Sequence, residues 1–353
     1  MNKKFRDSLI NLGETLAMLV LALLVGALMV KISGNEPLEA YSAMLTGAFG
    51  KNPLKSQMKI YELLVKVIPL MMVAFAMSIA FKAQLWNIGA GGQFVMGAIA
   101  STAVALYVPV PIPFRIALSL AAAIAAGAFW GWLAGWLKVR FNANEVITTL
   151  MLSYIANCIL LWLINGPMQD PYSDLTQSDV IPEAMFLPRL IGNYRLHSGI
   201  FILVFVAVVM CFFWKTPLGY QIELVGQGRK VATYSGVNVD RTIQTAMLIS
   251  GGLAGLAGWI EMFGILHRLF PDIASNYGDI SNIIALLGGL NPYGIIASSF
   301  FFAVLINGGS SMNRMTNVPY SIVDVIQGLI IIFVIAKVIL HRKNSSAAVK
   351  KSK

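Results

Sequence analysis

Isolated polar side chains inside long apolar segments are the residues of this sequence that could do chemistry. Three carboxylates, Glu145, Glu261 and Asp324, lie in or at the edge of such segments. A charge at the centre of a membrane-spanning helix costs roughly 2.5–3.5 kcal/mol on insertion scales, so it needs a polar cavity or a partner. The segments also carry amides, at Asn87, Gln93, Asn144, Asn157, Asn282, Asn291, Asn307 and Gln327.

Polar groups with little net charge suit a neutral or zwitterionic substrate in transit. We therefore expect a translocation path lined by Asn87, Gln93, Asn144, Glu145, Asn157, Glu261, Asn282 and Asn291. A single amide could equally serve only to join two helices by a hydrogen bond. Glu145 could stand at the membrane surface as a first-turn residue favoured by the helix dipole. The set therefore carries the prediction better than any one member.

A polar, basic segment at 215–241 separates two apolar ones. Its central part, GQGRKVATYSGVNVDR, begins with glycines and continues as a short helix-compatible run. Charged side chains of such a run cannot lie in hydrocarbon, so the segment lies at the membrane surface. Its basic residues favour the cytoplasmic side. It is either a connecting loop or a docking surface for a partner, formed by Arg229, Lys230, Val231, Ala232, Thr233, Tyr234, Ser235 and Gly236.

Composition sets the class of protein that must position these residues. The chain has 353 residues, 57% of them hydrophobic and 12% charged, with a mean hydropathy of +0.73. Soluble domains carry about 25% charged residues, so the sequence predicts an all-α polytopic membrane protein. The net charge of +10 is then attributed to cytoplasmic loops rather than to nucleic-acid binding. The two cysteines lie in apolar runs, which argues against a disulfide framework.

A membrane-spanning helix needs roughly 20 mostly apolar residues. On that basis we expect one membrane domain over 1–353, with an uncleaved first helix and a basic cytoplasmic tail at 341–353. Two short regions interrupted by Gly or Pro, 79–97 and 282–294, lie in opposite halves and suggest broken helices beside a central path. The ten expected spans are approximately 9–32, 61–80, 93–108, 114–137, 145–165, 199–214, 242–263, 276–289, 293–307 and 320–340.

The distribution of charge predicts the membrane orientation of the chain, and the spacing of glycines predicts how its helices pack. The loops on the side of both termini hold 15 Lys and Arg and the opposite loops hold 9, which favours cytoplasmic termini. Gly127, Gly131 and Gly135 recur at every fourth position of one span, and Gly251 and Gly255 do so on another. Small residues at this spacing let helix backbones approach closely, so we expect them to pack helices inside one subunit, with a dimer contact as the alternative.

Motifs of enzymes and of nucleotide binding are missing. Phe94 occupies the position at which the dinucleotide fingerprint needs its third glycine, and GQGRK lacks the spacing of a phosphate-binding loop. The three histidines, His197, His267 and His341, form no metal motif. We expect no catalytic residue, no metal and no cofactor on this chain. A transporter without its own energy source needs an ion gradient or an ATPase partner.

Four stretches carry a resemblance to a known family. GQGRKVATYSGV is similar to the cytoplasmic coupling segment of permease subunits of bacterial ABC importers, in the branch that includes branched-chain amino acid, ribose and nucleoside permeases. LWNIGAGGQFVMGAIAST resembles the F-N-I-G-x-x-G-Q signature of that branch. NANEVITTLMLSYIAN resembles the nucleoside-type members, and IALLGGLNPYGIIASSFF resembles their second Gly-Asn-Pro segment.

The resemblance implies a multi-pass subunit of a bacterial plasma membrane. Its expected partners are a second permease, identical or homologous, cytoplasmic ATPase subunits and an extracellular substrate-binding protein or lipoprotein. The coupling segment would transmit ATPase motion to an alternating-access path, with nucleosides as substrates. Trp86, Phe94 and Tyr154 could stack on a base, and no cationic clamp for phosphate is evident. The alternatives are a permease for ribose-like sugars or branched-chain amino acids, an ion-coupled transporter, and a membrane enzyme or structural protein.

Overall fold

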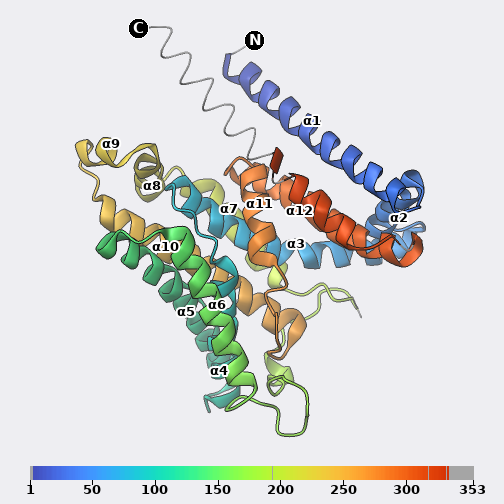
Figure 1. The fold of residues 1–353 in the computed structure, drawn as a ribbon. Helices are drawn as coiled ribbons and strands as arrows, with labels where there is room; N and C mark the ends of the chain where they lie inside the picture. Colours follow the sequence, from blue (N-terminus) through green and yellow to red (C-terminus); the bar gives the residue numbers. More distant parts are fainter. Residues whose placement is uncertain (1–2, 193, 317, 331, 334–353) are drawn as a thin grey trace. The chain divides into compact units, whose positions relative to one another are not determined.

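Helices make up nearly all the regular structure of the computed structural model, which describes residues 3–192, 194–316, 318–330 and 332–333 (Figure 1). Within that part of the chain the only β-pairing is two isolated bridges, Gln169 with Ser178 and Arg189 with His197. The fold class expected from composition, an all-α polytopic membrane protein, is confirmed. The elements, in chain order, are α1 (Lys3–Ile32), α2 (Pro37–Phe49), α3 (Pro53–Lys82), α4 (Ala90–Tyr107), α5 (Ile112–Phe141), α6 (Glu145–Ile164), η1 (Glu183–Met185), α7 (Gly199–Phe213), α8 (Pro217–Gln227), α9 (Arg229–Tyr234), α10 (Val239–Glu261), the π-helical turn η2 (Met262–Leu266), α11 (Tyr277–Leu287) and α12 (Pro292–Thr316).

The chain divides into two compact units. One contains Met1–Leu63 and Phe300–Lys353, and the other contains Leu64–Ser299. In the first unit α2 packs against α1, where the Tyr41 hydroxyl donates to the Leu23 carbonyl at 2.6 Å. A Cβ built on Gly47 would collide with Ser311, so α2 also lies directly on α12 in this unit.

The core of the second unit is a bundle of α4, α5, α6 and α10, with α10 packed closely on α5 and α4 (Figure 1). The recurring glycines cause this approach. A Cβ on Gly127 would lie 2.8 Å from the Gly255 Cα and closer still to the Gly251 carbonyl oxygen. A Cβ on Gly131 would likewise meet the Met247 carbonyl oxygen. The expectation that these glycines pack two spans within one subunit is confirmed.

Six helical segments among the described residues are long and apolar enough to cross a membrane, at Lys55–Lys82, Ala90–Tyr107, Ile112–Phe141, Glu145–Ile164, Val239–Leu266 and Pro292–Thr316. Two bent pairs raise the number to eight. Ala17–Ile32 with Pro37–Phe49 turns by 117°, and Gly199–Phe213 with Pro217–Gln227 turns by 66°. The expected span at 276–289 is the 11-residue α11, which is short for a full crossing.

Part of the sequence-based topology lies outside the described residues. The expected span at 320–340 is represented by the apolar helix Ser321–Ile330, and its remainder is mostly not described. The basic tail at 341–353 is not described either. The count of ten spans and the single domain over 1–353 therefore stay predictions.

Candidate functional site

Two of the expected path residues form a buried amide pair at the start of α4. Asn87 Nδ2 donates to Gln93 Oε1 and Gln93 Nε2 donates back to Asn87 Oδ1, both at 3.1 Å. Asn87 Nδ2 also donates to the Ser250 hydroxyl of α10 at 3.2 Å. The two amides are buried, with 0% and 1% of their surface exposed. Because their hydrogen-bonding groups meet one another, they hold the turn before α4 in place and do not face a cavity.

The glycines of the same stretch bring α4 against α6. The Ile88 N–H donates to the Thr149 hydroxyl, and the Gly92 N–H donates to the Ser153 hydroxyl, each at 3.1 Å. A Cβ at Gly89 would stand 2.6 Å from the Thr149 carbonyl oxygen. Only glycine allows this approach, so the LWNIGAGGQ stretch is a joint between α4 and α6.

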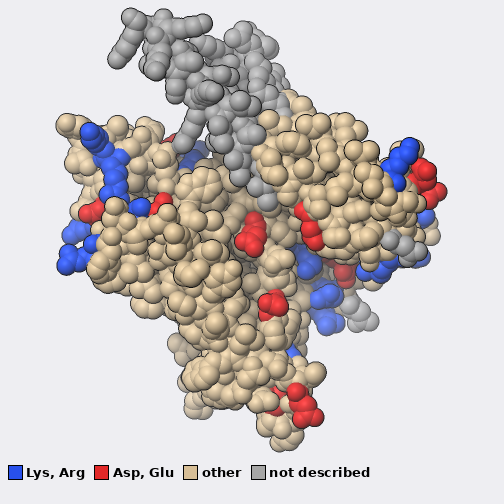
Figure 2. All heavy atoms as spheres, in the orientation of Figure 1, with Lys and Arg blue, Asp and Glu red and all other residues tan. Residues whose placement is uncertain are grey.

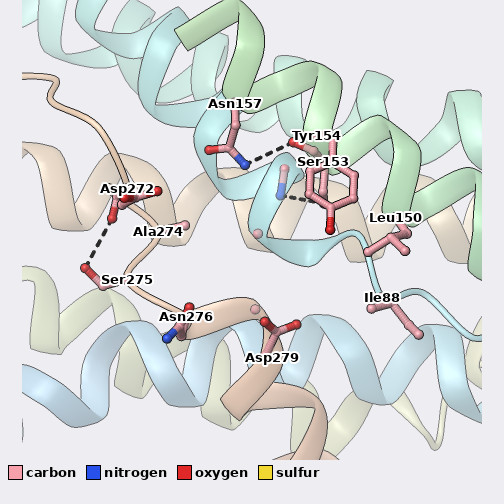
Figure 3. Close-up of a pocket in the computed structure, with 13 residues that line it drawn as sticks. Ile88, Leu150, Ser153, Tyr154, Asn157, Asp272, Ala274, Ser275, Asn276 and Asp279 are labelled. Carbon is pink, nitrogen blue, oxygen red and sulfur yellow. Dashed lines mark hydrogen bonds between the residues drawn. The ribbon is translucent and has the colours of Figure 1, made fainter. Parts of the chain in front are cut away.

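A cavity of about 460 Å³ lies on the other side of this joint (Figure 3). One wall is the middle of α6, one is the turn that begins α4, and the third is the segment from Asp272 to the start of α11. Its lining residues are Ile88, Gly91, Gly92, Leu150, Ser153, Tyr154, Asn157, Asp272, Ala274, Ser275, Asn276, Gly278 and Asp279. The side chains from α6 face those from the 272–279 segment across the opening (Figure 3).

The lining combines apolar and polar side chains and contains acidic residues. It contains the carboxylates of Asp272 and Asp279 but no Lys, Arg or His. Asn157 belongs to it, and its Nδ2 donates to the Ser153 carbonyl at 3.1 Å. Of the expected path residues, Asn157 is the one that the structure places in this cavity. A site with this charge suits neutral or cationic solutes and repels phosphorylated ones.

Glu261 lies in a second polar cluster, at the point where α10 passes into the π-helical turn η2. Lys66 Nζ donates to the Tyr277 hydroxyl at 2.9 Å, and that hydroxyl donates to Glu261 Oε1 at 3.1 Å. Glu261 is 5% exposed and Tyr277 is 4% exposed. The chain of hydrogen bonds joins α3, α10 and α11 and provides Glu261 with the partner that a buried carboxylate requires.

The remaining path candidates are separated from these groups. Asn144 is exposed and caps α6, with Oδ1 accepting from the Val146 N–H at 3.0 Å. Glu145 forms an ion pair with Lys138 of α5 at 2.7 Å, which matches its alternative reading as a first-turn residue. Asn291 is exposed and caps α12 through the Tyr293 N–H. Asn282 Oδ1 is buried and has no hydrogen-bond partner among the described residues.

Sequence reasoning missed most of the cavity. Ser153, Asp272, Ser275, Asn276 and Asp279 were not among the candidates, although the stretch PDIASNYGD concentrates polar residues between two apolar helices. That density was the available signal. The density of polar residues indicates that this stretch is not part of a membrane helix. It does not show which helix forms the opposite wall of the cavity.

The basic segment at 215–241 contains two helices, α8 and α9. Gly228, with φ 150°, separates them, and Gly236, with φ 77°, follows α9. Ala232 is fully buried, whereas Tyr234 is 92% exposed and Val231 47% exposed. The helix expected at this position is confirmed. Figure 2 shows Lys and Arg side chains where α9 lies and few charges over α5 and α6.

α8 is seated on the end of α3. A Cβ on Gly226 would collide with the Lys82 carbonyl oxygen. The Lys82 ammonium lies 4.0 Å from the centroid of the Trp214 ring, a cation–π contact. The turn that follows Lys82 leads directly to the Asn87 pair and to the cavity wall at Ile88. The basic segment is thereby connected to the cavity through packed backbone.

Comparison with known proteins agrees with this arrangement of broken helices and a basic surface segment. The family of permease components of branched-chain amino acid transport systems matches residues 59–335. The chain belongs to this family. It is therefore a multi-pass membrane permease subunit of an ABC transporter, as the resemblance of its four stretches implied.

Relatives of this permease cover almost its whole length. A glucose ABC transporter permease protein of Haloferax volcanii is 33% identical over 94% of this chain and 88% of its own. A guanosine ABC transporter permease protein of Bacillus subtilis is 32% identical over 90% of each chain. A nucleoside ABC transporter permease protein of Lactococcus lactis is 32% identical over 97% of this chain and 94% of its own. ABC permeases in general work with ATPase and substrate-binding partners.

Proposed function

We propose that this permease is part of a bacterial importer that takes up nucleosides at the expense of ATP. The observation that carries the substrate is similarity over nearly the full chain to a guanosine permease and to a nucleoside permease. The cavity agrees in charge, because nucleosides are neutral and its lining contains no cationic group for a phosphate. Its volume lies in the range of small-molecule sites.

A sugar is the second candidate, and a specific observation favours it. The glucose permease of Haloferax volcanii is as similar to this chain as the two nucleoside-named permeases are. Glucose and nucleosides share a ring that bears neighbouring hydroxyl groups and no charge. The charge of the cavity is compatible with both.

The energy would come from separate ATPase subunits that bind α9. The exposed side chains of α9, among them Tyr234, Val231 and the two basic residues at its start, give a partner an accessible mixed surface. The segment 229–236 is the proposed coupling site. Because α8 rests on α3, movement of α9 would reach the turn at Asn87 and the cavity wall. ATP hydrolysis is then a property of the partner and not of this chain.

The proposed assembly has two permeases, two ATPases and an extracellular binding protein in the plasma membrane. Both termini of this chain would face the cytoplasm, since the more basic loops lie on their side. The subunit alternates between outward-open and inward-open states as the ATPases close and separate.

Uptake of labelled substrate tests the proposal. Cells with and without this chain are given labelled adenosine or uridine, and unlabelled competitors are added in turn. We expect uptake only when the chain is present, with competition by nucleosides. Competition by glucose or ribose and none by adenosine would move the substrate to a sugar. Uptake that continues after the ATPase partner is removed would contradict the ATP-driven mechanism.

A further inference from the structure

The cavity lies beside the middle of a helix that is long and apolar enough to cross a membrane. Residues 150–157 lie in the middle of the 20-residue helix α6, and the opposite wall at 272–276 is not helical. Non-helical backbone at membrane depth is stable only when it is buried in protein or lines a water-filled cavity. The same wall carries carboxylates, which do not face lipid. The two walls therefore enclose an aqueous opening beside a spanning helix.

Two carboxylates in this opening lack a partner within the described part of the chain. Asn157 Nδ2 donates to the Ser153 carbonyl, and the Ser153 hydroxyl accepts from the Gly92 N–H, so neither contact involves the carboxylates. The carboxylates of Asp272 and Asp279 have no hydrogen bond or ion pair with any described residue. Ionised carboxylates only accept hydrogen bonds, so they need a ligand that is rich in donors.

Three kinds of contact then define the ligand. The carboxylates can accept from hydroxyl groups, and one carboxylate can accept from two neighbouring hydroxyls at once. Tyr154, 60% exposed, offers a ring face on which an apolar ring face can pack. Ser275 and Asn276 add neutral polar groups, which a compact ammonium ion would leave unused and a ring with several hydroxyls would engage.

We propose that this cavity binds the sugar part of the substrate, with Asp272 and Asp279 accepting hydrogen bonds from two adjacent hydroxyl groups and Tyr154 packing on the ring (Figure 3). The site selects for the vicinal diol and not for the base of a nucleoside. This inference rests on the proposed function as an importer of neutral ring compounds, but it does not depend on the choice between nucleoside and hexose.

The test compares each diol substrate with an analogue that lacks hydroxyls, in the assembled importer reconstituted in liposomes with its ATPase and binding protein. The pairs are adenosine with 2′,3′-dideoxyadenosine, and glucose with 2,3-dideoxyglucose, because neither analogue retains two adjacent hydroxyls. Asp272→Asn and Asp279→Asn keep the side-chain shape and remove the charge. We expect each variant to lower uptake of the diol substrate about tenfold and to leave uptake of the analogue within about twofold, because a hydrogen bond to a charged group is lost only with the diol.

A matched control and a shared component keep the result specific. Glu39→Gln removes an exposed carboxylate from the first turn of α2, which does not line the cavity, and it should change uptake of neither substrate of a pair. Every variant is assayed with the same binding protein. The selectivity of that protein therefore cancels when the uptake of each substrate by a variant is divided by its uptake by the wild type. Membrane levels and melting temperatures identify variants that fail to fold, and for those Asp279→Ser and Asp272→Ser provide a second measurement.

The outcomes separate this inference from the proposed function. If the wild-type importer takes up glucose but not adenosine, the nucleoside proposal is overturned. The glucose pair then tests whether the cavity binds a vicinal diol. An equal loss for diol and analogue, or no loss for either, overturns the diol site while nucleoside import stands. Absence of uptake of both substrate classes by the wild-type importer overturns both proposals.

Discussion

At the scale of single residues, the structure assigns most of the polar groups to positions within helix junctions. Asn87 and Gln93 satisfy one another, and Glu145 pairs with Lys138. The sequence shows that such residues are unusual in apolar segments, but it does not show which of them have partners. Asn157 and Asn87 are both amides in mostly apolar segments, so the sequence does not distinguish them. The fold shows that Asn157 lines a cavity, whereas Asn87 is hydrogen-bonded to Ser250.

The hydroxyl of Tyr277 is expected to contribute to stability, because it connects Lys66 to the buried Glu261. In Tyr277→Phe both charged groups lose that partner, and an unsatisfied buried polar group costs about 1–3 kcal/mol, with more for a charged one. Tyr172→Phe is the matched control, since Tyr172 is 95% exposed. Melting temperatures of the purified variants measure the difference. Equal melting of the two variants would show that the hydroxyl is dispensable.

His197 is expected to make the loop at 166–198 sensitive to acid. It is 1% exposed, and its Nδ1 accepts from the Gly199 N–H at 3.2 Å. Burial, with nearby His267 and Arg195, lowers the pKa of His197 to about 4 from its usual 6.5. An opened loop binds a proton below pH 6.5 and the closed loop does not, so the closed form loses stability as the pH falls from 6.5 towards 4.

This loss is expected to reach about 2 kcal/mol at pH 5 relative to neutral pH. Hydrogen exchange of amides in the loop around Ser178 and His197, at pH 7 and pH 5 and corrected for intrinsic rates, measures it. His197→Asn replaces the imidazole acceptor with an amide oxygen that does not titrate. The variant should lose the part of the pH dependence that His197 contributes and keep the part that comes from His267, whose pKa is also lowered by burial and by Arg189 and Arg195. A wild-type loop that is equally protected at both pH values would refute the assignment.

At the scale of elements, some helix starts that a cap or a glycine marks were predicted, but α3 begins at Pro53 and not at 61, and α8, which begins at Pro217, was not expected. α6 begins at Glu145 behind the Asn144 cap, and α9 begins at Arg229 behind Gly228, as their sequences indicate. The cavity could not be predicted in the same way. Its walls come from 88–92, 150–157 and 272–279. The hydrophobic periodicity within each segment does not show that these three distant segments meet.

Gly226 is expected to be essential for seating α8 on α3. In Gly226→Ala the new Cβ would collide with the Lys82 carbonyl oxygen, and such overpacking costs about 1–3 kcal/mol. We expect α8 to shift and uptake to fall, while the ATPase still associates through α9. Gly252→Ala is the control, because its Cβ would meet Ala128 at an ordinary 3.5 Å. Normal uptake by Gly226→Ala would disprove a role of this contact in transport.

Breaking α9 itself should have a different effect. The Ala232 N–H donates to the Gly228 carbonyl at 3.0 Å, and proline at 232 removes this donor at a cost of ~3 kcal/mol or more. Ala232→Pro should insert in the membrane normally but should neither transport nor retain the ATPase during purification. Glu223→Ala, at an exposed position of α8 outside the segment 229–236, should retain both. Full transport by Ala232→Pro would rule out α9 as the coupling helix.

At the scale of the whole molecule, the distribution of charge and the position of the broken helices are consistent with a single direction of insertion. The segment 215–241 carries four Lys and Arg, and the loop at 166–198 carries several carboxylates. The positive-inside rule predicts that α9 lies in the cytoplasm and that this loop lies outside. The same assignment is required if α9 binds an ATPase and the loop receives substrate from a binding protein.

Labelling of single cysteines tests this orientation directly. In a background in which Cys158 and Cys211 are replaced by alanine, Asp174→Cys and Tyr234→Cys each present one accessible thiol, since both positions are exposed. A membrane-impermeant thiol reagent added to intact cells should label position 174, and should label position 234 only after the membrane is permeabilised. Charged side chains cannot cross hydrocarbon once the helices are inserted, so the pattern is fixed for each molecule. Labelling of position 234 but not of position 174 in intact cells would show that the orientation is the reverse of the one predicted. α9 would then lie outside the cell and could not bind a cytoplasmic ATPase.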